Sequence, residues 1–291
     1  MKNAVLVTIL WFICLLPTAA FAQTKVVNEG IKAYQNGQWA EAIAALDEGL
    51  ADPAALNEKT LAEGYAHRAL AKVRFLIQAR LDMPENMEQL GEEYSLTAYD
   101  DFKRAQKYDP KGKLEEPIAE GLRKLKNVLL ELAGDAGNQV NRIGLSPEDK
   151  ARQARQLKAY AAPILEMDKY NYKAYDFLAD ALYAMEDFAG ALKNYKLADD
   201  WFFRSAPRGG DLGIGYTYIR IAELEWRVNR DFAAAMAAIQ EGHKVLAGED
   251  KKIQNLGNRR PAEKASFQVM YEEIAAKIDK MEATIKAKAG K

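Results

Sequence analysis

The sequence predicts an all-α protein built from consecutive pairs of helices, and three observations lead to this prediction. Alanine, leucine, lysine and glutamate dominate the composition and favour helix. Strand patterns of alternating apolar residues are absent. A spacing of three, four and three residues recurs along the chain and places a leading aromatic, a small, a bulky and a small residue on one helix face. Such a face is typical of a helix that packs closely on the helix before it.

Three copies of this spacing are complete, and they begin at Trp39, Phe188 and Phe232. A fourth copy has Ser95 at the aromatic position. The other members are Ala42, Leu46 and Gly49; Ala98, Phe102 and Ala105; Ala191, Tyr195 and Ala198; and Ala235, Ile239 and Gly242. Each complete copy predicts a helix that starts at its aromatic residue, and the recurrence indicates a repeat architecture.

These segments resemble the tetratricopeptide repeat (TPR) family, in which a unit of about 34 residues folds as two antiparallel helices, A and then B. The strongest match is Lys173–Ala198, where Leu178 and Ala179 stand in the place of the family's Leu-Gly pair. Shorter matches cover residues 37–43, 65–71 and 98–110. The resemblance implies an α-solenoid of antiparallel helix pairs, which we expect to comprise about five pairs plus a long C-terminal capping helix.

The copies are unevenly spaced, so we expect insertions in loops or in lengthened helices. Ser146 and Pro147, followed by two acidic residues, predict a helix start within a degenerate repeat. The last helix is expected from about Pro261 to about Lys288. Its apolar stripe predicts a cap over the open end of the solenoid, with a dimerising or partner-binding helix as the alternative. The stripe consists of Ile274, Ile278, Met281 and Ile285.

The first residues have the pattern of a secretory signal peptide. Lys2 supplies a positive start, an apolar run follows from Ala4 to Leu16, and Ala20-Phe21-Ala22 is a small-x-small cleavage site. We expect cleavage after Ala22; a membrane anchor is the alternative, but the run is short for a bilayer. Cys14 is the only cysteine, so the expected mature chain has neither disulfides nor thiolate chemistry. These features predict a periplasmic or secreted bacterial protein.

The expected organisation is a signal peptide (1–22), a TPR-like helical repeat domain (23–259) and a C-terminal capping helix (260–291). The formal net charge of −1 gives no global attraction to nucleic acid or to anionic membranes. We therefore expect no nucleic-acid partner, no transmembrane segment after signal cleavage, and a monomer or weak dimer.

No catalytic or metal-binding constellation is apparent. His67 and His243 fit no metal-ligand spacing, and we expect His243 near a helix end, where the helix dipole favours it. The members of Asp100-Asp101 and of Asp199-Asp200 point about 100° apart on a helix, and we expect both pairs on solvated faces. The glycine-rich segment 209–215 lacks the Lys-Ser/Thr of a P-loop and is expected to be a connection. These patterns predict a protein that is not an enzyme and uses no cofactor or metal.

The family resemblance also implies a binding groove lined by the A helices. Aromatic and arginine side chains with interleaved charges suit an extended peptide, although some of these residues could instead pair with each other. A second candidate surface is the aromatic run from Trp201 to Arg204, which is either core or an interface. Carried over position by position, with one extra residue in the second turn, the groove residues are Lys173, Asp176, Asp180, Tyr183, Arg220, Glu223, Trp226 and Arg227.

The sequence thus predicts a non-enzymatic scaffold or adaptor of the bacterial cell envelope that binds a protein or peptide on its concave face. A different class of function is an envelope glycan-binding protein, which 14 tyrosines and 4 tryptophans in a helical framework would suit. An enzyme that uses carboxylates near the glycine-rich segment is a third reading.

Overall fold

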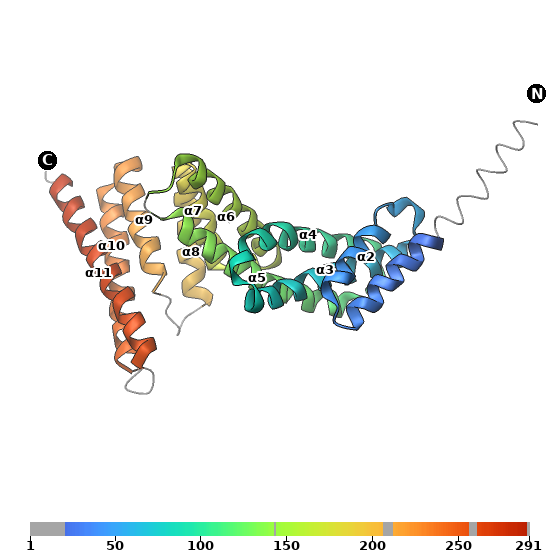
Figure 1. Ribbon diagram of the computed structural model, residues 1–291. Helices are drawn as coiled ribbons and strands as arrows, with labels where there is room; N and C mark the ends of the chain where they lie inside the picture. The colour runs from blue at the N-terminus through green and yellow to red at the C-terminus, as the bar shows by residue number, and fades with distance from the viewer. Residues whose placement is uncertain (1–20, 143, 206–211, 256–260, 290–291) are drawn as a thin grey trace, which may run out of the picture. The chain divides into compact units, whose positions relative to one another are not determined.

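The computed structural model describes residues 21–142, 144–205, 212–255 and 261–289, and all regular structure in these ranges is helical (Figure 1). The predicted all-α class is therefore confirmed, with eleven α-helices that pack in adjacent pairs in the part described. None of these helices combines the length and apolar character that crossing a membrane requires. The predicted signal peptide falls almost entirely on residues 1–20, which lie outside the described residues.

A first helix covers residues 21–35. It is followed by α2 (Trp39–Gly49), α3 (Glu58–Asp82), α4 (Met87–Tyr108), α5 (Glu115–Val140), α6 (Pro147–Met167), α7 (Tyr172–Ala184), α8 (Phe188–Ser205), α9 (Ile214–Leu224), α10 (Phe232–Asn255) and α11 (Pro261–Ala289). Short 3-10 turns, η1 (Pro53–Ala55) and η2 (Pro84–Asn86), precede α3 and α4, and a π-helical turn, η3 (Glu225–Asn229), follows α9.

The chain divides into two compact units, one up to Leu132 and one from Ala133 on. In the first unit, α3 packs against both α2 and α4. In the second unit, each helix from α6 to α10 packs against the next helix in the chain, and α11 is the last of the series. Each unit thus buries its apolar side chains through contacts between neighbours, as repeat proteins do.

The recurring helix face is the buried face in all four copies. The helices α2, α8 and α10 begin at Trp39, Phe188 and Phe232, as the spacing predicts. The small and bulky members that follow are all buried, whereas the leading aromatics lie nearer the surface. In the fourth copy Ser95 lies well inside the long helix α4 and is fully buried, where its hydroxyl donates to the carbonyl of Gly91 (2.5 Å).

The extra length between repeats is taken up largely by long helices. In the first unit α3 has 25 residues and α4 has 22, and α5, which spans the boundary of the units, has 26. The predicted start of α6 is confirmed, because Ser146 Oγ accepts a hydrogen bond from the Asp149 amide (3.1 Å). The last helix also has nearly the predicted bounds, and three of its four stripe residues are fully buried.

The turns between paired helices share a left-handed residue two positions before the aromatic. Gly37 has φ of 77°, Glu186 has φ of 64° and Arg230 has φ of 59°. Glycine adopts this conformation without cost, whereas a side chain with a Cβ is strained there. The three turns therefore share this left-handed residue, although only the first has the residue type that indicates it.

Candidate functional site

The predicted groove residues lie on α7, α9 and η3 in the second unit. Side chains of α7 and α9 are in contact, although α8 separates the two helices in the sequence. The hydroxyl of Thr217 on α9 donates to Asp176 Oδ1 on α7 (2.6 Å). The guanidinium carbon of Arg220 on α9 lies 4.2 Å from the ring centroid of Tyr183 on α7. These contacts join side chains of α7 and α9, the two helices to which the predicted groove residues belong.

Arg220 is the centre of a polar network on this surface. Its Nη1 donates to Glu223 Oε2 (3.1 Å), and its Nη2 donates to the side-chain oxygen of Asn141 (3.2 Å). Asn141, which directly follows α5, also donates through Nδ2 to Asp180 Oδ2 (3.1 Å). The network therefore joins α7 and α9 to the end of α5, and Asn141 is a member that the sequence did not predict.

Tyr195 of α8 adds a further hydrogen bond to the network. Its hydroxyl donates to Asp180 Oδ1 (2.5 Å), and its side chain is almost fully buried. Burial, together with the neighbouring Asp180, raises the pKa of Tyr195 well above its ordinary value, so the phenol keeps the proton that it donates. Burial also raises the pKa of Asp180, while the hydrogen bond from Tyr195 and the charge of Arg220 oppose the rise.

Arg220 keeps its charge in this setting. Burial alone would lower its pKa, but the nearby Tyr195, Tyr183 and Asp180 outweigh that effect and raise the pKa of Arg220. Its side chain is still 29% exposed, so part of the guanidinium lies at the surface. A stacked arginine that is both held and accessible can present hydrogen-bond donors to a ligand at little entropic cost.

Glu223 and Arg227 extend the network to the solvent. Arg227 Nη1 donates to Glu223 Oε1 (2.6 Å), and the Arg227 side chain is 59% exposed, against 14% for Glu223. Five of the eight predicted residues thus meet directly in one network, and Asp176 is joined to α9 through Thr217. Those five are Asp180, Tyr183, Arg220, Glu223 and Arg227.

The remaining two predicted residues have other surroundings. Trp226 is partly buried and packs against the apolar core of the second unit. Lys173 is exposed at the start of α7, with its Nζ 5.9 Å from the ring centroid of Tyr172. The predicted position of Trp226 assumes one extra residue in the turn between α9 and α10, and the π-helical turn η3 contains this extra residue. The Asp231 amide bonds to the carbonyl of Glu225, six residues back, whereas the Asp187 amide bonds to that of Leu182, five back.

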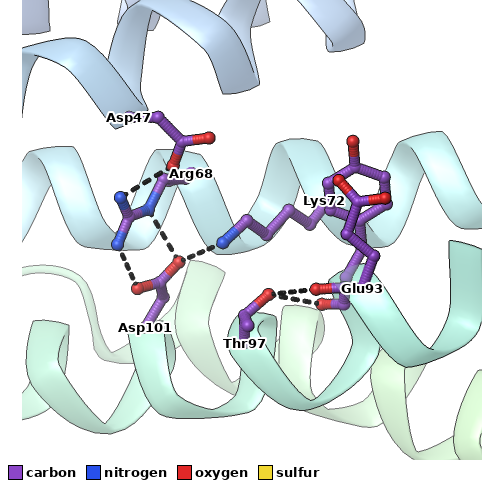
Figure 2. Close-up of polar contacts among 7 residues, drawn as sticks. Asp47, Arg68, Lys72, Glu93, Thr97 and Asp101 are labelled. Atoms are coloured by element: carbon purple, nitrogen blue, oxygen red, sulfur yellow. Dashed lines mark hydrogen bonds and ion pairs between the residues drawn. The ribbon is translucent and has the colours of Figure 1, made fainter.

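A second polar cluster lies in the first unit (Figure 2). Arg68 of α3 donates to both carboxylate oxygens of Asp101 on α4, at 2.6 and 2.8 Å, and to Asp47 on α2 at 2.9 Å. Lys72 Nζ donates to the same Asp101 at 3.0 Å, and both side chains are almost fully buried. Asp101 is therefore not on a solvated face, as its adjacency to Asp100 suggested, and its cluster joins three helices.

This cluster has the properties of a structural element. Burial leaves little surface on Lys72 or Asp101 for a ligand, and each cation already has a carboxylate partner. Arg68 and Lys72, one helical turn apart in an otherwise apolar stretch, were the sequence signal for a buried acidic partner. Asp199, in the other acidic pair, is also partly buried and accepts a hydrogen bond from Tyr218.

The aromatic run at the end of α8 is divided between core and surface. Phe202 is 5% exposed, whereas Phe203 is 53% exposed. Trp201 packs on Tyr170, with ring centroids 4.4 Å apart, and the Arg204 guanidinium lies 4.9 Å from the Trp201 ring centroid. In the glycine-rich segment that follows, residues 209–211 lie outside the described residues, and Leu212, Ile214 and Gly215 are buried.

No family model matches this chain, and none of the curated proteins does either. Three similar solved structures are pilF of Pseudomonas aeruginosa, the TPR2AB domain of yeast Sti1 in a complex with pHSP90, and a computationally designed self-assembling cyclic homooligomer. The first is 16% identical with a TM-score of 0.29, over 89% of this chain and 98% of that chain. The second is 17% identical with a TM-score of 0.27, over 87% and 98%. The third is 14% identical with a TM-score of 0.28, over 94% and 97%.

TM-scores this low support no conclusion about a binding site or a partner of this chain. The TPR-like character of the chain therefore rests on its own helix pairs. The pair formed by α7 and α8 has the three-residue turn and the buried face of small and bulky side chains that the resemblance implies.

Proposed function

We propose that this chain is a non-enzymatic scaffold of the bacterial cell envelope, and that an extended segment of a partner protein binds on the surface formed by α7 and α9. The observation that carries the proposal is the stacked pair of Arg220 and Tyr183 at the centre of a network that ties the two helices together. We call this surface, defined by Lys173, Asp176, Asp180, Tyr183, Arg220, Glu223 and Arg227, the inner face.

The inner face has the composition of a peptide-binding surface. Arginine and tyrosine are enriched among the residues that dominate binding energy, because they bury a large area and still form hydrogen bonds. The partly exposed Tyr183 ring is fixed by Arg220, so little side-chain freedom is lost when a ligand covers it. Three acidic and three basic side chains give a mixed surface, which suits the polar backbone and side chains of an extended peptide.

The same geometry favours binding over catalysis. A catalytic group needs a nucleophile and a base in contact with each other, and a position where the reacting atom can lie. On the inner face the carboxylates of Asp180 and Glu223 instead accept hydrogen bonds from Asn141, Tyr195, Arg220 and Arg227. Asp180 is thereby bonded to the residue after α5 and to α8, and Glu223 to two arginines of α9 and η3, and this supports a rigid recognition surface.

Export to the envelope is the part of the proposal that depends on residues 1–22. A short basic start, an apolar run and a small-x-small site are the features that support it. The absence of cysteine after Cys14 is consistent with an oxidising compartment, because such a chain cannot form wrong disulfides.

Site-specific photo-crosslinking tests the location of the partner. A photoreactive residue in place of the exposed Arg227 or Lys173 is expected to capture one partner protein in cells that make the chain. The control position is Lys193, which is also exposed but lies on α8. Capture from Lys193 with none from Arg227 and Lys173 would show that the partner binds elsewhere on the second unit.

A further inference from the structure

Three potential metal-binding side chains meet between α10 and α11, away from the inner face. His243 Nε2 lies 3.0 Å from Glu282 Oε2 and 3.9 Å from Asp279 Oδ1. One ligand atom from each of the three residues lies within 4.8 Å of the others. His243 is in the middle of α10 and not near a helix end as expected, so the helix dipole does not account for its place.

The packing of the two helices fixes the backbone that carries these side chains, which are 41% (His243), 71% (Asp279) and 25% (Glu282) exposed. A Cβ on Gly242 would lie only 3.0 Å from Ile278 Cδ1, so the helices approach closely at this point. His243 directly follows Gly242, and Asp279 directly follows Ile278. Because Ile278 is fully buried, the backbone that carries Asp279 is fixed. Asp279 and Glu282 are three residues apart and therefore lie on the same side of α11.

The distances and the ligand types agree with a zinc ion. Zinc binds imidazole nitrogen and carboxylate oxygen at about 2.0–2.2 Å, which places the ligand atoms of a tetrahedral site about 3.4 Å apart. The distances from His243 Nε2 to Glu282 (3.0 Å) and to Asp279 (3.9 Å) lie on either side of this value. Imidazole disfavours magnesium and calcium, which prefer oxygen ligands. Three protein ligands leave the fourth position for water.

We propose that His243, Asp279 and Glu282 form a zinc site that links the last helix to α10. Glutamate is ordinarily a carboxylate at neutral pH, so Glu282 can supply an oxygen ligand. Lys286 bonds to Oε1, whereas Oε2 is the oxygen that faces His243 and is placed to bind the metal. The bound ion replaces the direct contact between His243 and Glu282 with two metal-ligand bonds. These bonds stabilise the packing of α11 on α10.

Calorimetric titration with zinc chloride tests the site directly. The chain from Gln23 on is used without a polyhistidine tag, and saturable binding of about one ion per chain is expected. His243→Gln and Glu282→Gln should each weaken binding tenfold or more, because each removes a ligand. His67→Gln is the matched control, since it removes the other histidine, and it should leave the zinc affinity unchanged. Magnesium chloride should give no saturable heat.

Thermal unfolding provides a second measurement that does not depend on the heats. Zinc should raise the melting temperature of the wild type, and a chelator should reverse the shift, because an ion that binds only the folded chain stabilises it. His243→Gln has an amide that can still donate to Glu282, so it should fold without showing the shift. The proposal is wrong if the wild type shows no saturable zinc binding, or if zinc stabilises His243→Gln as much as the wild type.

Discussion

The guanidinium of Arg220 stacks on the ring of Tyr183, 4.2 Å from its centroid, and through Asn141 the same guanidinium is linked to Asp180. These contacts connect two A helices that are separated by α8 in the sequence. Because Arg220 bonds to both the end of α5 and to α9 itself, the orientation of its side chain is fixed from several directions. The inner face is consequently a built surface and not a set of independent solvated side chains.

We expect Arg220→Ala to lower the free energy of unfolding by roughly 1–3 kcal/mol, because it removes the contact with Tyr183 and leaves Asn141 and Asp180 without the arginine. Arg227→Ala is the control, and its effect should be within about 0.5 kcal/mol because the Arg227 side chain is 59% exposed and Glu223 keeps Arg220 as a partner. Urea unfolding of both variants makes the comparison. Equal stability of the two variants would mean that Arg220 does not hold the helices together.

We expect the protein to lose stability above about pH 10, the ordinary pKa of tyrosine. Burial raises the pKa of Tyr195 and of Tyr218, so the folded state holds these protons more tightly than the unfolded state. The resulting stabilisation is complete below about pH 10 and is lost as the pH rises further. Urea unfolding at a series of alkaline pH values measures this dependence.

Tyr195→Phe should reduce that alkaline loss, because it removes one of the buried phenols whose pKa is raised. It should also lower stability at neutral pH by roughly 1–3 kcal/mol, since Asp180 loses a hydrogen-bond donor. Tyr170→Phe, at a side chain that is 46% exposed, is the control and should change neither quantity. An unchanged alkaline slope in Tyr195→Phe would rule out this origin of the pH dependence.

Glu186→Gly should stabilise the protein by roughly 1 kcal/mol, because a non-glycine residue is strained at the φ of 64° that this turn requires. Gly37→Ala, at the equivalent turn of the first repeat, should destabilise it by a similar amount for the same reason. Melting temperatures of the two variants should therefore shift in opposite directions. A loss of stability in Glu186→Gly would show that the turn is not left-handed.

Asp101→Asn should destabilise the first unit by about 3–5 kcal/mol, because Arg68 and Lys72 would lose the charge that compensates for their burial. Asp100→Asn alters the exposed neighbouring carboxylate and should have little effect. Unfolding followed by circular dichroism distinguishes the two variants. Similar curves for both would place Asp101 at the surface.

The helix pairs could be predicted from the sequence because their signal is local. The spacing from Phe188 to Ala198 lies within one helix. A small residue such as Ala191 on the buried face indicates that a neighbouring helix packs closely there. The starts of α2, α8 and α10 followed from the same pattern. The length of α3 and α4 did not, because an insertion can lengthen a helix or a loop with the same residues.

The site was predictable only in part, since its contacts join distant segments. Asp180, Tyr183 and Arg220 followed from their repeat positions, but Asn141 is 79 residues from Arg220 and lies after a helix end, outside the repeat pattern. The burial of Asp101 does not follow from the pair Asp100-Asp101, because adjacent residues on a helix face different directions and only the second of these faces the core. The left-handed Arg230 was missed because its residue type gives no sign of it.

The most direct test of the proposed function is the affinity of the captured partner for three forms of the chain, measured by calorimetry. The account predicts that Tyr183→Ala weakens binding by about 2 kcal/mol or more, as for a central aromatic anchor. Phe203→Ala, which removes an aromatic of the exposed run on α8, should bind like the wild type. Unchanged affinity in Tyr183→Ala together with a loss in Phe203→Ala would contradict the account and assign the partner to the aromatic run.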